Sequence, residues 1–135
     1  MTMTPSALCD LSGKTALVTG GATGIGRMAT TGLMAAGARV LIASRKGEAC
    51  VAVSTALNSL GLSGTAEGFG GDVSSEAGIA ALCQEVAQRT DKLDILINNA
   101  GRTWGAPLGH FPFEAWEKVM TLNIAGMFHL TQSLL

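Results

Sequence analysis

A glycine-rich run near the N-terminus could bind a phosphate group. It reads Thr19-Gly20-Gly21-Ala22-Thr23-Gly24-Ile25-Gly26. Residues without a Cβ allow a sharp turn and let the backbone approach a pyrophosphate closely. A helix that begins there offers unpaired N–H groups and a partial positive charge to the anion. Glycines also serve purely structural turns, but the apolar strand before this run and the helix after it favour a nucleotide. The predicted contacts are Gly20, Thr23, Gly24, Ile25 and Gly26, the last of which also lets the helix pack against the strand.

The end of the next apolar segment carries basic residues. Dinucleotide-binding folds place an acidic residue about 20 residues after the glycines, where it accepts hydrogen bonds from the ribose hydroxyls. Here that position reads Ala43-Ser44-Arg45-Lys46, without an acid. A guanidinium can bind a 2′-phosphate through paired charge-assisted hydrogen bonds, whereas a carboxylate would repel it. We therefore expect NADP(H) rather than NAD(H), with Arg45 as the main contact and Ser44 and Lys46 beside it. The alternative is that these basic residues only begin a surface loop.

Three further polar positions follow later apolar segments. Asp72 and Val73 come after the third predicted strand, and Asn98-Asn99-Ala100-Gly101 follows the fourth. Asn123 stands inside the last predicted helix, although asparagine is a mediocre helix former. Each has an ordinary alternative without a ligand. Asp72 could be a loop acid or a helix-capping acid, and Asn98 and Asn99 could bond backbone groups at a strand end. Asn123 could be an ordinary polar position of the helix.

Taken together, these motifs resemble the short-chain dehydrogenase/reductase family over about residues 11–135. The spacing Gly-x-x-x-Gly-x-Gly is similar to this family's, and the later motifs occur in the family's order. The resemblance implies that Asp72, with Val73 beside it, meets the adenine amino group. It also implies that Asn99, Ala100 and Gly101 line the cofactor and that Asn98 stabilises the sheet.

The same resemblance implies a catalytic role for Asn123, which in the family bends its helix and positions a water in a proton relay. The family is an oxidoreductase family that reduces a ketone or oxidises a secondary alcohol by hydride transfer. Its general acid is a tyrosine, assisted by a lysine and a serine. Within the family, residues 99–105 resemble bacterial 3-oxoacyl reductases, including those associated with rhamnolipid formation.

Hydrophobic periodicity predicts the elements that must position these residues. Apolar runs predict strands at 15–19, 39–43, 65–69 and 93–97. Helical spacing predicts helices over 25–36, over 48–60, from Ser74 or Ser75 onward, and after Pro112. Alternating strands and helices indicate βαβ units. The expected fold is therefore α/β, a doubly wound parallel Rossmann sheet in one domain spanning residues 1–135.

Composition narrows the function classes. The 135 residues are 47% hydrophobic and 14% charged, which suits a buried α/β core, and the net charge of −1 argues against nucleic acid. Cys9, Cys50 and Cys83 are isolated, which suggests reduced thiols and a cytoplasmic protein. No apolar run is long enough to cross a membrane. His110 and His129 lack partners at metal-ligand spacing, so no metal is expected.

The chain contains no tyrosine. It therefore cannot supply the general acid that the resemblance implies, and the apolar pattern still continues at Leu135 without a helix stop signal. We expect a chain truncated within its last helix and inactive alone, taken from a parent that acts on a small carbonyl or alcohol substrate as a homodimer or homotetramer. Two alternatives remain: a non-catalytic nucleotide-binding module, and an oligomerisation fragment whose last helix pairs with a partner.

Overall fold

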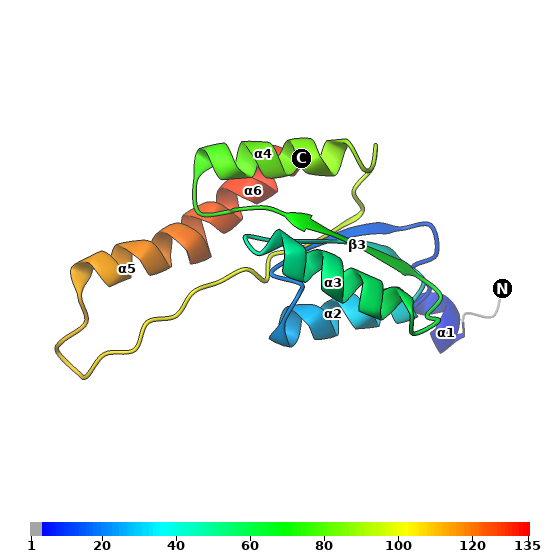
Figure 1. The fold of residues 1–135 in the computed structure, drawn as a ribbon, viewed down its shortest axis with the longest axis horizontal. Helices are drawn as coiled ribbons and strands as arrows, with labels where there is room; N and C mark the ends of the chain where they lie inside the picture. The colour runs from blue at the N-terminus through cyan, green and yellow to red at the C-terminus, as the bar shows by residue number, and fades with distance from the viewer. Residues whose placement is uncertain (1–3) are drawn as a thin grey trace.

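Four apolar segments form one parallel sheet in the computed structural model, which describes residues 4–135 (Figure 1). The strands are β1 (Thr15–Thr19), β2 (Arg39–Ser44), β3 (Thr65–Gly70) and β4 (Ile95–Ile97). Their spatial order is β3-β2-β1-β4. The sequence therefore predicted the sheet type and all four of these strands correctly.

The helices occupy the segments between these strands. The structure contains α1 (Pro5–Leu8), α2 (Gly24–Ala35), α3 (Gly47–Asn58), α4 (Glu76–Ala87), α5 (Phe113–Met120), the π-helical segment η1 (Thr121–Gly126) and α6 (Met127–Leu134). Gly37 follows α2 with φ of +97°, a left-handed conformation in which glycine commonly ends a helix. The Ser75 hydroxyl caps α4 by accepting a hydrogen bond from the Gly78 N–H at 3.1 Å.

Helices cover both faces of the sheet (Figure 1), and successive residues of a strand pack into different cores. Ala16 and Val18 of β1 pack into one core with residues of α2 and α3. Leu17, between them, packs into a second core with residues of α4 and with Leu130 of α6. Burial on both faces explains why the central strands lack polar alternation.

The winding direction of the chain reverses beside β1. The first crossovers carry the chain from β1 to β2 and then to β3, and the next crossover returns it to β4 on the other side of β1. In register, Val18 of β1 pairs with Ile42 of β2 and with Ile97 of β4, so the carboxyl ends of these strands meet at one edge. Ligands of open α/β sheets bind outside this edge, where the strand order reverses.

Two predicted elements differ in detail. The fourth strand begins at Ile95, two residues later than predicted, because the Asp94 carboxylate accepts the Thr15 N–H at 2.9 Å in place of a strand carbonyl. The last helix is not continuous α-helix, since η1 interrupts it around Asn123. The short helix α1 was not predicted.

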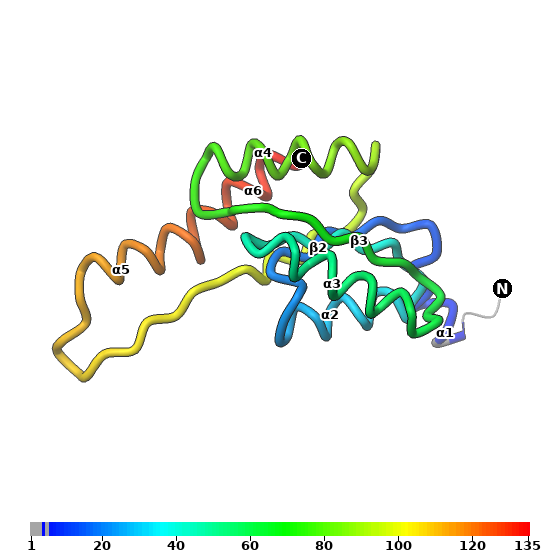
Figure 2. Tube along the Cα trace, viewed as in Figure 1, coloured from blue at the N-terminus to red at the C-terminus, as the bar shows by residue number. Residues whose placement is uncertain are grey.

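Residues 98–112 lead away from the sheet to α5, so this part of the chain extends beyond the main body (Figure 2). This segment and α5 together expose several large apolar side chains, among them Trp104, Leu108, Phe113 and Trp116. Over the described residues, no helix has both the length and the apolar character needed to cross a membrane.

Candidate nucleotide-binding site

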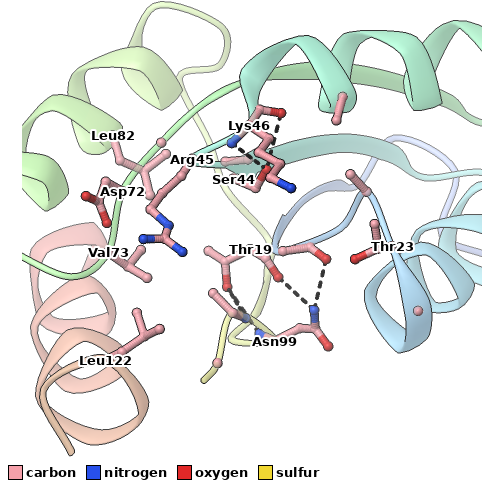
Figure 3. A pocket seen from close by; sticks show the side chains of 18 of the residues that line it. Thr19, Thr23, Ser44, Arg45, Lys46, Asp72, Val73, Leu82, Asn99 and Leu122 are labelled. Carbon is pink, nitrogen blue, oxygen red and sulfur yellow. Dashed lines mark hydrogen bonds between the residues drawn. The ribbon is translucent and has the colours of Figure 1, made fainter. Parts of the chain in front are cut away.

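A cavity of about 650 Å³ lies at the carboxyl edge of the sheet, where the segments after all four strands meet (Figure 3). Its volume lies within the usual range for small-molecule sites. Twelve of the thirteen predicted cofactor contacts line it: Gly20, Thr23, Gly24, Ile25, Ser44, Arg45, Lys46, Asp72, Val73, Asn99, Ala100 and Gly101.

Gly26 is the exception, because it lies behind the turn rather than on the cavity wall. A Cβ at Gly26 would lie 2.3 Å from the Gly20 carbonyl oxygen and 2.4 Å from the Asn99 side-chain nitrogen. Its role is therefore the close packing of α2 against the strand end, as the sequence indicated, and not a wall position. Gly20 and Gly24 adopt φ of +67° and +51°, a region that favours glycine.

The N-terminus of α2 faces the cavity with its first turn. The first intrahelical bond runs from the Arg27 N–H to the Thr23 carbonyl at 3.1 Å, so the N–H groups before Arg27 precede the helical ladder. Within residues 4–135, the Thr23 side chain forms no capping hydrogen bond to this helix. The hydroxyl of Thr23 and these N–H groups can thus bond an anion, which the helix dipole also favours.

The Thr19 hydroxyl joins the ends of β1 and β4. It donates to the Ile97 carbonyl at 3.3 Å and accepts from the backbone N–H groups of Asn99 at 3.1 Å and Ala100 at 3.0 Å. The Asn99 side-chain amide donates back to the carbonyls of Thr19 and Gly20, at 3.0 and 3.1 Å. These bonds fix the glycine turn and the Asn99–Gly101 wall relative to each other.

Asn98 has a different role from the one expected. Its side-chain amide donates to the Thr131 hydroxyl of α6 at 3.1 Å and makes no bond to a strand in the described part of the chain. The asparagine that braces the sheet edge is its neighbour Asn99, which also lines the cavity.

Three consecutive polar residues at the end of β2 form another wall. The exposed side chain of Arg45 reaches into the cavity, with its guanidinium between Val73 and Thr19 in the view of Figure 3. The Ser44 hydroxyl accepts the Lys46 N–H at 3.2 Å and so fixes the turn that carries both cations. Arg45 forms no ion pair with any described residue, which leaves its fork of donors open to an anion.

Asp72 stands at the end of β3 on the opposite wall. Its carboxylate accepts the Ser74 N–H at 2.9 Å. Hydrogen bonding from Ser74 lowers the pKa of Asp72, and the positive charge of Arg45 lowers it further by a smaller amount. The side chain is therefore ionised at neutral pH and acts as a hydrogen-bond acceptor at the cavity.

Asn123 contacts the chain that continues from the cavity wall. Its carboxamide oxygen accepts the Arg102 N–H, and its amide donates to the Arg102 carbonyl, both at 2.8 Å. A Cβ at Gly101 would lie 3.4 Å from the same Asn123 oxygen. The π-helical segment thus holds the segment after Gly101 by two hydrogen bonds from one side chain.

The family model described as short chain dehydrogenase matches residues 14–135. This chain belongs to the short chain dehydrogenase family. The match covers the glycine turn, the end of β2, and the segments after β3 and β4. The resemblance seen in the sequence is thereby confirmed.

Curated relatives of this chain include two reductases. It is 47% identical over 126 residues to the rhamnolipids biosynthesis 3-oxoacyl-(acyl-carrier-protein) reductase of Pseudomonas aeruginosa, covering 93% of this chain and 48% of that protein. It is 36% identical over 124 residues to the 3-oxoacyl-(acyl-carrier-protein) reductase FabG of Aquifex aeolicus, covering 91% and 49% respectively. The chain therefore spans about half the length of these relatives.

Solved structures of other short chain dehydrogenases have the same fold. One, described as the Pseudomonas aeruginosa RhlG/NADP active-site complex, superposes with a TM-score of 0.86 at 46% identity, covering 98% of this chain and 50% of that one. Another, a 3-oxoacyl (acyl-carrier-protein) reductase of Agrobacterium tumefaciens with NADP bound, has a TM-score of 0.84 at 29% identity, with 98% and 50% coverage. Both names describe NADP complexes.

Sequence reasoning missed some residues of the cavity of this chain. Thr19 is the clearest, since a threonine at a strand end adjoining a glycine turn signals a hydroxyl placed to bond nearby backbone. The remaining wall residues are small or apolar and carry no chemical signal in the sequence: Ala22, Ala43, Ala49, Gly71, Leu82 and Leu122.

Proposed function

We propose that this chain binds NADP(H) in the cavity at the carboxyl edge of its sheet. It would serve as the nucleotide-binding part of an oxidoreductase that reduces a ketone or oxidises a secondary alcohol. The observation that carries the proposal is the wall at the end of β2, where Arg45 and Lys46 line the cavity and the strand ends without an acid. A 2′-phosphate needs cations at this place, whereas a free ribose would be served by a carboxylate.

The residues present fit such a group. A Cβ at Gly20 would lie 2.9 Å from the Asn99 side-chain nitrogen and 3.2 Å from the Ala100 Cα, so the turn can approach the Asn99–Gly101 wall this closely only because Gly20 has no side chain. The first turn of α2 offers N–H donors to a pyrophosphate, and Asp72 offers an acceptor to an amino group. When bound, NADPH would supply a hydride to a carbonyl carbon.

We propose that Asn123 contributes to the proton relay that the family resemblance implies, by holding the neighbouring backbone in place. Its side chain is already bonded to both backbone groups of Arg102. By this contact it fixes the backbone that continues from Gly101, which lines the cavity.

A binding experiment tests the cofactor assignment. Isothermal titration of NADPH and NADH into the chain should give tighter binding of NADPH. Replacing Arg45 with alanine should weaken NADPH binding by about 10- to 100-fold, because hydrogen bonds to charged groups contribute about 1.5–3 kcal/mol, and should change NADH binding little. Arg27→Ala is the matched control, since Arg27 is an exposed cation of α2 outside the cavity.

Equal affinity for the two cofactors would contradict the proposal. So would an Arg45→Ala variant that binds NADPH as tightly as the wild-type chain does.

We further propose that a polypeptide of these 135 residues binds the cofactor without reducing a ketone. The sequence contains no tyrosine, the general acid that the family resemblance implies. The relatives named above favour a 3-oxoacyl thioester as the substrate class of the whole enzyme. Incubation of the chain with NADPH and a 3-oxoacyl thioester should leave NADPH absorbance unchanged, and turnover above the uncatalysed rate would contradict this. Sedimentation velocity tests the expected homodimer or homotetramer.

A further inference from the structure

Cys50, in the first turn of α3, lies directly behind the wall at the end of β2. Its side chain is fully buried, and its sulfur lies 3.1 Å from the Ser44 hydroxyl oxygen. Cys50 does not line the cavity, but Ser44 does. The thiol is therefore a hidden neighbour of a residue that faces the ligand.

The Ser44 hydroxyl can take part in only a few hydrogen bonds. A hydroxyl carries one hydrogen and two lone pairs. The Lys46 N–H, 3.2 Å away, can only donate and so takes one lone pair. If the Cys50 thiol donates to the other, the Ser44 hydrogen is left to point elsewhere. Its one acceptor outside the thiol among the described residues is the Lys46 carbonyl, at the long distance of 3.4 Å.

A bound 2′-phosphate needs that hydrogen. Phosphate oxygens act mainly as acceptors at neutral pH, and a hydroxyl that donates to them forms a charge-assisted bond. A hydroxyl whose lone pairs are both occupied by protein donors is already arranged as a donor to the phosphate. A thiol is a weak donor, but here it sits in a fixed, dry position where water does not compete.

The position of Cys50 is held by backbone packing. Its N–H donates to the Lys46 carbonyl at 3.2 Å, which begins α3. A Cβ on Gly68 of β3 would lie 2.1 Å from the carbonyl carbon and oxygen of Cys50, so the helix rests directly on the strand backbone. The backbone that carries the thiol is therefore fixed beside Ser44, and the side chain itself is fully buried.

We infer that Cys50 is a positioning residue for the discrimination of NADPH from NADH: its thiol donates to the Ser44 hydroxyl and directs that hydroxyl's hydrogen toward the 2′-phosphate. This inference rests on the proposed binding of NADP(H). By this inference, Cys50 strengthens the hydrogen bond between Ser44 and the 2′-phosphate although its own side chain does not contact the cofactor.

The test is a double-mutant cycle read by isothermal titration with NADPH and NADH. Cys50→Ala should weaken NADPH binding about three- to tenfold, the range expected for one hydrogen bond, and leave NADH binding within about twofold. Cys50→Ser keeps a donor and should restore NADPH affinity. In a Ser44→Ala chain, which has lost the hydroxyl, adding Cys50→Ala should change NADPH affinity by less than about twofold.

Two further variants control for a purely structural effect. Cys83→Ala removes a partly buried cysteine of α4 outside the cavity and should alter neither affinity. Cys50→Val fills a similar volume without a donor and replaces Cys50→Ala if the smaller side chain prevents folding.

Equal weakening of NADPH and NADH binding in Cys50→Ala would overturn the inference, as would additive losses from Cys50→Ala and Ser44→Ala. A wild-type chain without preference for NADPH would overturn the proposed function as well. A wild-type preference that persists unchanged in Cys50→Ala would overturn this inference alone.

Discussion

Two glycines of α2 allow a matched test of how the glycine turn is built. Gly26, in the first turn of the helix, faces the Gly20 carbonyl, and a Cβ there would lie 2.3 Å from that oxygen. Gly32, later in the same helix, has nothing within 4 Å of the corresponding position. Gly26→Ala and Gly32→Ala make the same chemical change in one helix with opposite surroundings.

The geometry sets the size of both effects. Real Cβ contacts essentially never fall below 3.0 Å, so an alanine at position 26 must move the turn backbone from its 2.3 Å separation to at least that distance. Overpacking of this kind costs about 1–3 kcal/mol. An alanine at position 32 should instead stabilise the chain by about 0.5–1 kcal/mol, because glycine disfavours a helix interior.

Thermal unfolding followed by circular dichroism measures the difference. At about 3–5 °C per kcal/mol for a domain of this size, the Tm of Gly26→Ala should lie about 5–20 °C below that of Gly32→Ala. NADPH affinity should also fall in Gly26→Ala, because the displaced turn carries Asn99 with it. If both variants melted together with the wild-type chain, the close approach of α2 to the turn would be refuted.

Other interactions give further tests. The Arg89 guanidinium lies 4.1 Å from the centre of the Phe69 ring and pairs with Glu67 and Glu85. Arg89→Ala should lower the free energy of unfolding by about 1–3 kcal/mol. Urea unfolding should show a smaller loss in high salt, because salt screens the ion pairs. The folded-state pKa of Asp72 lies below its ordinary value of 3.8 because Ser74 bonds the carboxylate, so its stabilisation is present above that pH and is lost as the pH falls through the folded pKa. The Tm of Asp72→Asn should thus fall less steeply in acid than that of the wild-type chain; parallel curves would refute this. Asn123→Ala removes two hydrogen bonds to Arg102 and should speed hydrogen exchange of the Arg102 amide about tenfold or more, with unchanged exchange as the contrary result.

The sheet and the cavity wall could be predicted because they follow from local patterns. Buried strands such as residues 39–43 are continuous apolar runs, and the glycines of the turn must follow a strand if they are to bind a phosphate. Parallel strands bring their carboxyl ends to one edge, so a predicted parallel sheet is consistent with one site for Thr23 after the first strand and Asp72 after the third. The contact of Asp72 with the cofactor was implied by the family resemblance.

Contacts that depend on three-dimensional packing could not be predicted. That Asn99 also braces the sheet edge, whereas Asn98 bonds α6, depends on which side chain faces the turn and which faces that helix. The bond between Ser44 and Cys50 depends on the close seating of α3 on β3. A poor helix former at Asn123 and the helix bend implied by the family resemblance pointed to an irregular helix there. No sequence pattern specifies the π-helical geometry or the two bonds from Asn123 to Arg102.

The glycines of β3 have a consequence for how cofactor preference can change. Gly68 lies against the backbone of Cys50, and a Cβ on Gly47 would lie 2.9 Å from the Gly70 nitrogen. At these two glycines backbone therefore rests directly on backbone, and the start of α3 is held against β3 by contacts that do not involve residues 44–46. Residues 44–46 directly precede α3, and their side chains can be exchanged without disturbing the contact of this helix with β3. Selection or design can reverse their charge, and with it the choice of nucleotide, while the frame that carries them stays in place.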